Sequence, residues 1–258
     1  MERIGRFDRL SALAEKHMRR GVLTNTLITR ETYEPYIRRG ALTALETEHG
    51  LFLLRDRGDR ALLSFLMEPG APLPALSDGA VCEIAFRERD TGLAALPERF
   101  EAAGFETVLR RIRLARPAGP CDPPEEPLCS PESPEEAGAF LRGHFSSLTG
   151  CLPGEEELRD AFAGRRLLAV RERDTLCGLI HFSVSGKQTQ IRHLAVGEGY
   201  RGRGLAGRLI RGFLAETDGM RSAVWTGEEN IPAVRAYLSA GYSPDGARSA
   251  VLFKGRTV

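Results

Sequence analysis

The chain has 258 residues, more than most single domains, and the composition of an ordinary globular protein, with 42% hydrophobic and 28% charged residues. Its 36 basic and 35 acidic side chains leave a net charge of +1, which gives no overall field for nucleic acid or an anionic membrane, so we expect neither as a partner. No apolar stretch is long enough to cross a membrane and no apolar leader is visible, so we expect a cytoplasmic protein. The five cysteines are scattered without a CxxC pair, which argues against a metal site and a disulfide framework.

The N-terminal half predicts a mixture of helices and strands. Apolar residues at helical spacing favour a helix over residues 6–26 and a second over 32–39. In chain order there follow strands at 51–55, 61–67 and 81–86, a helix at 91–103 that Gly104 ends, and a strand at 106–114. On that last strand Arg111 and Arg113 share one face, which we expect to face solvent.

A proline-rich stretch separates the two halves. Seven prolines between residues 117 and 134 rule out a continuous helix or a central strand, although 128–130 could form a short edge strand. The sequence therefore predicts a domain at 1–116, a linker at 117–133 and a second domain at 134–258.

The C-terminal half predicts elements in the order α-α-β-β-β-α-β-α-β. Ser133 and Pro134 are typical of a helix start, and Asn230 and Pro232 of another. The expected helices are 134–148, 155–162, one from 205 and 231–240, and the expected strands are 167–170, 176–184, 190–196, 223–225 and 251–253. We expect the α/β (α+β) class, with a mixed, mostly antiparallel sheet flanked by helices and two domains in tandem.

The most informative stretch is Tyr200–Ala206, where a strand passes into a helix. Its two glycines and two arginines would present backbone N–H groups and positive charge to one point, as a pyrophosphate-bearing cofactor requires. Gly202-x-Gly204-x-x-Gly207 also fits the dinucleotide fingerprint, but the preceding strand belongs to a hairpin and not to a parallel βαβ unit. A Walker A loop is excluded because no Gly-Lys-Ser/Thr follows.

Three motifs in order resemble the GNAT superfamily of acyl-CoA N-acyltransferases over about residues 128–254. Arg201-x-x-Gly204-x-Ala206 resembles the family's Arg/Gln-x-x-Gly-x-Gly/Ala signature. Leu194-Ala195-Val196 resembles the end of the family's fourth strand. The third motif resembles the pattern after its fifth strand and consists of Asn230, Tyr237 and Gly241-Tyr242.

The resemblance implies binding of acetyl-CoA (coenzyme A). In such proteins the loop backbone holds the pyrophosphate at the helix N-terminus, and the fourth strand pairs with the pantetheine arm where the fourth and fifth strands splay apart. The residues that match these roles are Arg201, Gly202, Arg203, Gly204, Leu205 and Ala206 for the pyrophosphate, and Leu194, Ala195 and Val196 for the arm. Asn230 also matches the binding pattern, although a helix cap is the preferred interpretation. Tyr237 matches the position that protonates the departing thiolate, or it simply packs beside Val234 and Leu238.

The general base is less clearly indicated. Gln190 stands where some family members have glutamate, and Trp225 stands about where others have an acidic residue. His193 is a candidate base, with His181 nearly opposite Arg192 or His193 across the hairpin, but strand alternation could turn His193 toward a packed helix. Glu228 and Glu229 fit a solvated loop better than a base.

The first half repeats the closing pattern of the second, since strand, helix, Gly-Phe and strand at 81–114 mirror the elements at 223–253. It is either a degenerate copy that lost cofactor binding, and shapes the acceptor site or mediates a homodimer, or an unrelated α/β domain. We expect an N-acyltransferase that moves an acetyl group from acetyl-CoA to a primary amine of a small molecule or peptide by direct attack in a ternary complex. The alternatives are a coenzyme-A-binding sensor or scaffold without turnover and a purely structural tandem protein.

Overall fold

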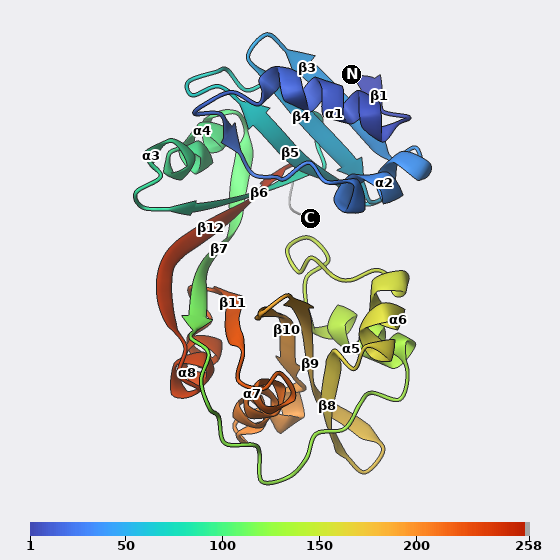
Figure 1. Ribbon diagram of the computed structural model, residues 1–258, viewed down its shortest axis with the longest axis vertical. Coiled ribbons are helices and arrows are strands. Elements are labelled where there is room, and N and C mark those ends of the chain that lie inside the picture. Colours follow the sequence, from blue (N-terminus) through green and yellow to red (C-terminus); the bar gives the residue numbers. More distant parts are fainter. Residues whose placement is uncertain (256–258) are drawn as a thin grey trace. The chain divides into compact units, whose positions relative to one another are not determined.

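The computed structural model describes residues 1–255, which form two compact units. The N-terminal unit comprises residues 1–110 together with the C-terminal segment from Ala247, and the C-terminal unit comprises Arg111–Gly246. Each unit is a sheet with helices packed on it (Figure 1). This confirms the mixed, mostly antiparallel sheet flanked by helices that the element order predicts.

The N-terminal unit has a sheet in the order β1-β3-β4-β5-β6-β12, with β2 added to β5. All of these pairs are antiparallel except β5 with β6, which is parallel. Its strands are β1 (Glu2–Arg3), β2 (Leu23–Thr24), β3 (Leu42–Thr47), β4 (Gly50–Asp56), β5 (Ala61–Met67), β6 (Ala80–Arg87), the start of β7 (Phe105–Arg116, to Arg110) and the end of β12 (Ser243–Lys254). Its helices are α1 (Phe7–His17), α2 (Arg30–Arg38), α3 (Thr91–Ala94) and α4 (Leu96–Ala102).

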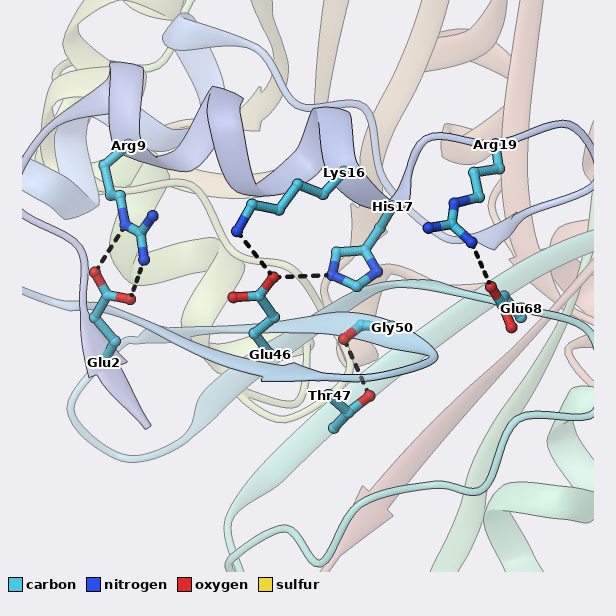
Figure 2. Close-up of polar contacts among 9 residues, drawn as sticks. All are labelled: Glu2, Arg9, Lys16, His17, Arg19, Glu46, Thr47, Gly50 and Glu68. Carbon is cyan, nitrogen blue, oxygen red and sulfur yellow. Dashed lines mark hydrogen bonds and ion pairs between the residues drawn. The ribbon is translucent and has the colours of Figure 1, made fainter.

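Strand alternation gives this sheet two apolar faces. On β4, Leu51 and Leu53 join the cluster formed with α1 and α2, while Phe52 and Leu54 join the cluster formed with α4. Polar contacts also connect α1 and the residues after it to β1, β3 and the residue that follows β5 (Figure 2). Arg9 pairs with Glu2, Lys16 and His17 contact Glu46, and Arg19 pairs with Glu68. Most of these side chains are well exposed, so burial of the apolar faces contributes most of the stability.

The C-terminal unit has a sheet in the order β7-β11-β10-β9-β8. Its strands are β7 (Phe105–Arg116, from Arg111 on), β8 (Leu167–Glu172), β9 (Thr175–Ser185), β10 (Gln188–Val196) and β11 (Arg221–Gly227). Its helices are α5 (Pro134–His144), α6 (Glu155–Ala163), the 3-10 turn η1 (Glu198–Tyr200), α7 (Leu205–Glu216) and α8 (Ile231–Ser239). One apolar cluster joins the sheet to α7 and α8, and a second joins its other face to α5 and α6.

Each unit takes a strand from the other half of the chain. Residues Arg111–Arg116 of β7 pair with β11, and Ala247–Lys254 of β12 pair with β6. The units therefore differ from the predicted division at 1–116, 117–133 and 134–258. The stretch 117–133 lies within the C-terminal unit, where Cys129 forms an isolated antiparallel bridge with Ala169. In place of the short edge strand expected over 128–130, the structure has this single bridge.

Most predicted elements are present with shifted ends. The predicted helix over 6–26 ends at His17, and after a turn at Gly21, whose φ is +85°, the chain forms β2. The predicted helix over 91–103 is divided into α3 and α4 at Ala95. The alternating strand β3 is absent from the prediction, and β12 begins eight residues before the predicted strand 251–253. Among the described residues, no helix combines the length and apolarity needed to cross a membrane.

Candidate functional site

The N-terminus of α7 is an uncapped helix end. Gly204, the N-cap residue, has left-handed backbone angles of 76° and 5° and supplies no side-chain cap. Arg208 N–H donates to the Gly204 carbonyl at 3.1 Å and begins the helical hydrogen bonding. Helix geometry therefore leaves the N–H groups of residues 205–207 without an intrahelical acceptor, at the positive end of the helix dipole.

The two glycines of this loop leave room beside those N–H groups. Gly202 and Gly204 both have a φ of +76°, which side chains other than glycine rarely adopt. A Cβ atom placed at either position would meet no protein atom within 4 Å. The backbone conformation therefore favours glycine at both positions. The space that a side chain would occupy there is free of protein atoms and could admit an anion.

The arginines of the loop are exposed and partly engaged. Arg201 Nε donates to the Val196 carbonyl at 3.4 Å. Arg203 pairs with Glu172 at 3.3 Å and donates to the Gly199 carbonyl at 3.0 Å, with its guanidinium 5.2 Å from the Tyr200 ring centroid. Arg203 is therefore partly neutralised by a carboxylate, whereas Arg201 contacts a backbone carbonyl.

The strands β10 and β11 run parallel only over their first residues. Their register covers four pairs, from Gln188 with Arg221 to Ile191 with Val224, although both strands continue beyond. Past that point Leu194, Ala195 and Val196 still pair with β9 on their other side. The edge of β10 that faces β11 is therefore left for an additional partner, next to the loop that precedes α7.

The N-terminal unit fills the corresponding place with its own chain. Its parallel strands β5 and β6 pair over only two positions, Ala61 with Ala80 and Leu62 with Val81. Beyond them β2 pairs with β5, and the Asn25 amide Nδ2 donates to the carbonyls of Leu63 at 3.1 Å and Glu83 at 3.0 Å. The Phe65 N–H donates to Asn25 Oδ1 at 2.9 Å. One side chain thus bridges the two strands where they part.

Tyr237 lies on α8 inside the apolar cluster of the C-terminal unit. It is 4% exposed, and its ring packs edge-on against Tyr242 with centroids 5.6 Å apart. Burial, with a smaller contribution from Tyr242, raises the pKa of the Tyr237 phenol. The group is therefore protonated at neutral pH, which is the form that can donate a proton.

A β-bulge determines where His193 points. Ile191 pairs with Phe182 and His193 with His181, so Arg192 is an extra residue on β10. The bulge turns His193 away from the face that Ile191 covers, toward the α5–α6 side, where the Phe145 ring meets it edge-on at 5.0 Å. His193 is 4% exposed, and its Nε2 lies 2.8 Å from the Gly150 carbonyl and its Nδ1 3.2 Å from His181 Nδ1.

Both histidines are held neutral by their surroundings. Burial lowers the pKa of His181 to about 3, helped by His193 and by the charges of Arg192 and Arg166. Burial also lowers the pKa of His193, with Arg192 and Arg111 acting in the same direction and the Gly150 carbonyl opposing them. The structure thus places His181 opposite His193, as the hairpin predicts, and engages both nitrogens of His193.

Several other predicted residues have structural partners. Asn230 Oδ1 accepts from the Ala233 N–H at 3.2 Å and caps α8. The arginines expected to face solvent are partly buried: Arg111 donates to the Thr149 carbonyl, and Arg113 binds Asp245 at 2.7 Å and lies 5.6 Å from the Trp225 ring. Sequence reasoning missed the segment 145–154, to which both Arg111 and His193 donate, because no motif marks it. Within the part of the chain that the structure describes, no cluster of three His, Cys, Asp or Glu residues could hold a metal ion.

Comparison with known proteins finds a family model that matches part of the C-terminal half. Residues 140–242 match the model of the acetyltransferase (GNAT) family, which confirms the resemblance of the C-terminal half. No curated protein sequence matches the chain.

Solved structures show the same fold over most of the chain. A GNAT-family putative acetyltransferase from Novosphingobium aromaticivorans is 17% identical with a TM-score of 0.52, covering 83% of this chain and 92% of its own. A GCN5-related N-acetyltransferase from Kribbella flavida is also 17% identical, with a TM-score of 0.53 and coverage of 88% and 93%. A third, from Sphaerobacter thermophilus, is 15% identical with a TM-score of 0.53 and coverage of 87% of each chain.

Proposed function

We propose that the C-terminal unit, with its GNAT-family segment, binds acetyl-CoA and transfers the acetyl group to a primary amine. The observation that carries the proposal is the uncapped N-terminus of α7 beside the free edge of β10. The first feature offers N–H donors and open space for a pyrophosphate, and the second offers a backbone edge for an amide-bearing arm.

The residues of the chain divide these tasks. The loop Arg201–Ala206 would hold the phosphates, with Arg201 as the charged side chain least committed elsewhere. The edge Leu194–Val196 would pair with the pantetheine arm, as β2 pairs with β5 in the other unit. Bound acetyl-CoA would supply an activated thioester, which an amine can attack directly without a covalent enzyme intermediate.

Tyr237 is the proposed proton donor to the departing thiolate sulfur. Its raised pKa keeps the phenol neutral, but also makes it a weaker acid than a free phenol. Transfer is favourable only if the sulfur is buried in equally apolar surroundings, where the pKa of a thiol is raised as well. We assign no general base, because the nitrogens of His193 are engaged with Gly150 and His181.

The test replaces Gly204 with glutamate and measures acetyl-CoA binding by calorimetry. Gly204→Glu would place a carboxylate against the phosphates in space that the protein does not fill, so we expect affinity to fall at least 30-fold, or about 2 kcal/mol. Unchanged affinity would show that the cofactor does not use this loop.

Gly186→Glu is the matched control. Gly186 lies in the turn between β9 and β10, has a φ of +57° and also has no protein atom within 4 Å of a Cβ position. It carries the same backbone strain and charge at the other end of β10, and we expect acetyl-CoA affinity to stay within twofold. Release of free thiol from acetyl-CoA across a panel of primary amines then separates a transferase from a protein that only binds coenzyme A.

A further inference from the structure

The segment between α5 and α6 is folded against β10 by a specific turn. Gly150 N–H donates to the Ser146 carbonyl at 2.8 Å, and Leu148 N–H donates to Ser146 Oγ at 3.1 Å. A Cβ on Gly150 would lie 2.6 Å from the Ser146 carbonyl oxygen, so only glycine fits there. This turn directs the Gly150 carbonyl toward His193.

Two strands hold this segment. His193 on β10 donates to Gly150, and Arg111 on β7 donates to Thr149. His193 comes two residues after Ile191, the last residue of β10 paired with β11, and Arg111 pairs with Gly227 at the end of β11. The segment therefore reaches from β10 to β7 past the diverging ends of β10 and β11.

The hydrogen bonds determine the tautomers of the histidine pair. The Gly150 carbonyl can only accept a hydrogen bond, so the proton of the neutral His193 ring is on Nε2. Its Nδ1 then has a lone pair and can only accept. His181 Nδ1, 3.2 Å away, must then be the donor. His181 Nδ1 thus donates to His193 Nδ1, and His193 Nε2 donates to the Gly150 carbonyl. The bulge at Arg192 places His193 opposite His181.

We propose that His193 is a positioning residue that holds segment 145–154 at the open end of β10 and so shapes the acceptor side of the transfer site, with His181 fixing its tautomer. The proposal rests on the proposed transferase function. It assigns no proton transfer to His193, and it places the amine acceptor next to the Thr149–Gly150 turn. The Phe145 ring, edge-on to His193, supports the same placement from the end of α5.

The test compares His193→Leu with His193→Gln, using the primary amine that gives the most thiol release. Leucine cannot donate to Gly150, so we expect the KM for the amine to rise at least tenfold while kcat changes less than threefold. The amide of glutamine can donate but cannot act as a base at neutral pH, and should restore the KM to within threefold. An equal loss of kcat in both variants would make His193 the base and overturn the proposal, as would an unchanged KM in His193→Leu.

His144→Leu is the matched control. His144 also lies 2.7 Å from a backbone carbonyl, that of Phe140, but within its own helix α5, so its replacement should leave the KM for the amine within twofold. A tenfold rise in this variant would show that any loss of packing near α5 has the same effect.

Two measurements test the tether without any transferase activity. Nitrogen-15 spectra of the imidazoles should show His193 protonated at Nε2 and His181 at Nδ1, and the opposite tautomers would overturn the proposal. Amide hydrogen exchange in segment 145–154 should accelerate at least tenfold in His193→Leu and not in His193→Gln. If exchange responds as expected but no amine releases thiol, the tether stands and the transferase assignment fails.

Discussion

At the residue scale, the buried histidine pair makes folding sensitive to pH. Both rings are neutral in the folded chain, with the pKa of His181 near 3, whereas an unfolded histidine titrates near 6.5. Between these values the unfolded chain binds more protons than the folded one, so stability present above about pH 6.5 is lost as the pH falls toward 3.

We therefore expect the C-terminal unit to lose at least about 2 kcal/mol of stability between pH 7 and pH 5 through these histidines. Urea unfolding followed by the fluorescence of Trp225, the single tryptophan of the chain, measures this unit. In His181→Asn the loss over that range should be smaller, because one titrating group is gone. The same loss in His181→Asn as in wild type would contradict the expectation, and His49→Asn, on the surface of the N-terminal unit, serves as the control.

Removal of a single atom tests the proposed role of Tyr237 as proton donor. Tyr237→Phe removes the phenolic oxygen, and we expect kcat to fall about 100-fold with little change in acetyl-CoA affinity, as for loss of a general acid. Tyr242→Phe, in the same cluster, removes the 2.7 Å hydrogen bond from Ser222 and should cost about 1 kcal/mol of stability without that loss of turnover. Steady-state kinetics on both variants decides, and equal turnover in Tyr237→Phe at every pH would exclude it from the mechanism.

Residue types could predict the backbone conformation of the Arg201–Ala206 loop but not the orientation of His193. The backbone of Gly202 and Gly204 is a local property, so the glycines indicate it directly. The face of His193 depends on the extra residue Arg192 relative to β9, and a bulge leaves no mark in the alternation of one strand. The donors Arg111 and His193 meet segment 145–154 only through the tertiary fold.

At the element scale, the two units share a pair of parallel strands that separate, but only the N-terminal unit fills the gap with its own chain. In both, two parallel strands part after a few pairs. In the C-terminal unit α7 follows β10, whereas in the N-terminal unit residues 68–79, with three prolines, form no helix between β5 and β6. There β2 and Asn25 occupy the free edge of β5.

We accordingly expect one acetyl-CoA per chain in calorimetric titration, and two would contradict this account. Asn25→Ala should leave that stoichiometry and affinity unchanged while it destabilises the N-terminal unit by about 3 kcal/mol, because two carbonyls and one N–H lose their partner. Hydrogen exchange at the Phe65 amide should accelerate in Asn25→Ala. It should not change in Asn230→Ala, which removes a comparable side-chain acceptor in the C-terminal unit.

Element type was more predictable than element length. The C-terminal helices and strands follow the predicted order because caps such as Ser133 and Asn230 are local signals, and both form the expected cap hydrogen bonds. The first helix was predicted too long because its periodic apolar residues continue past His17, and Gly21 turns the chain into β2. The short strands β1 and β2 have two residues each and exist only through pairing with β3 and β5.

At the scale of the whole molecule, the two units do not correspond to two continuous stretches of sequence. Prolines at 117–133 indicated a boundary, because prolines interrupt helices and strands. Membership of a unit is decided instead by long-range pairing, in which residues 111–116 complete one sheet and 247–254 the other. No local pattern carries that information.

Because β7 pairs with β11 and β12 pairs with β6, the chain cannot be divided into two fragments that each fold alone. A gene divided within the proline stretch would encode two pieces, each lacking a strand that its own sheet requires. Each piece made alone would expose a bare strand edge and tend to aggregate. A working pair would have to be co-expressed, so that each fragment finds the missing strand in the other during folding.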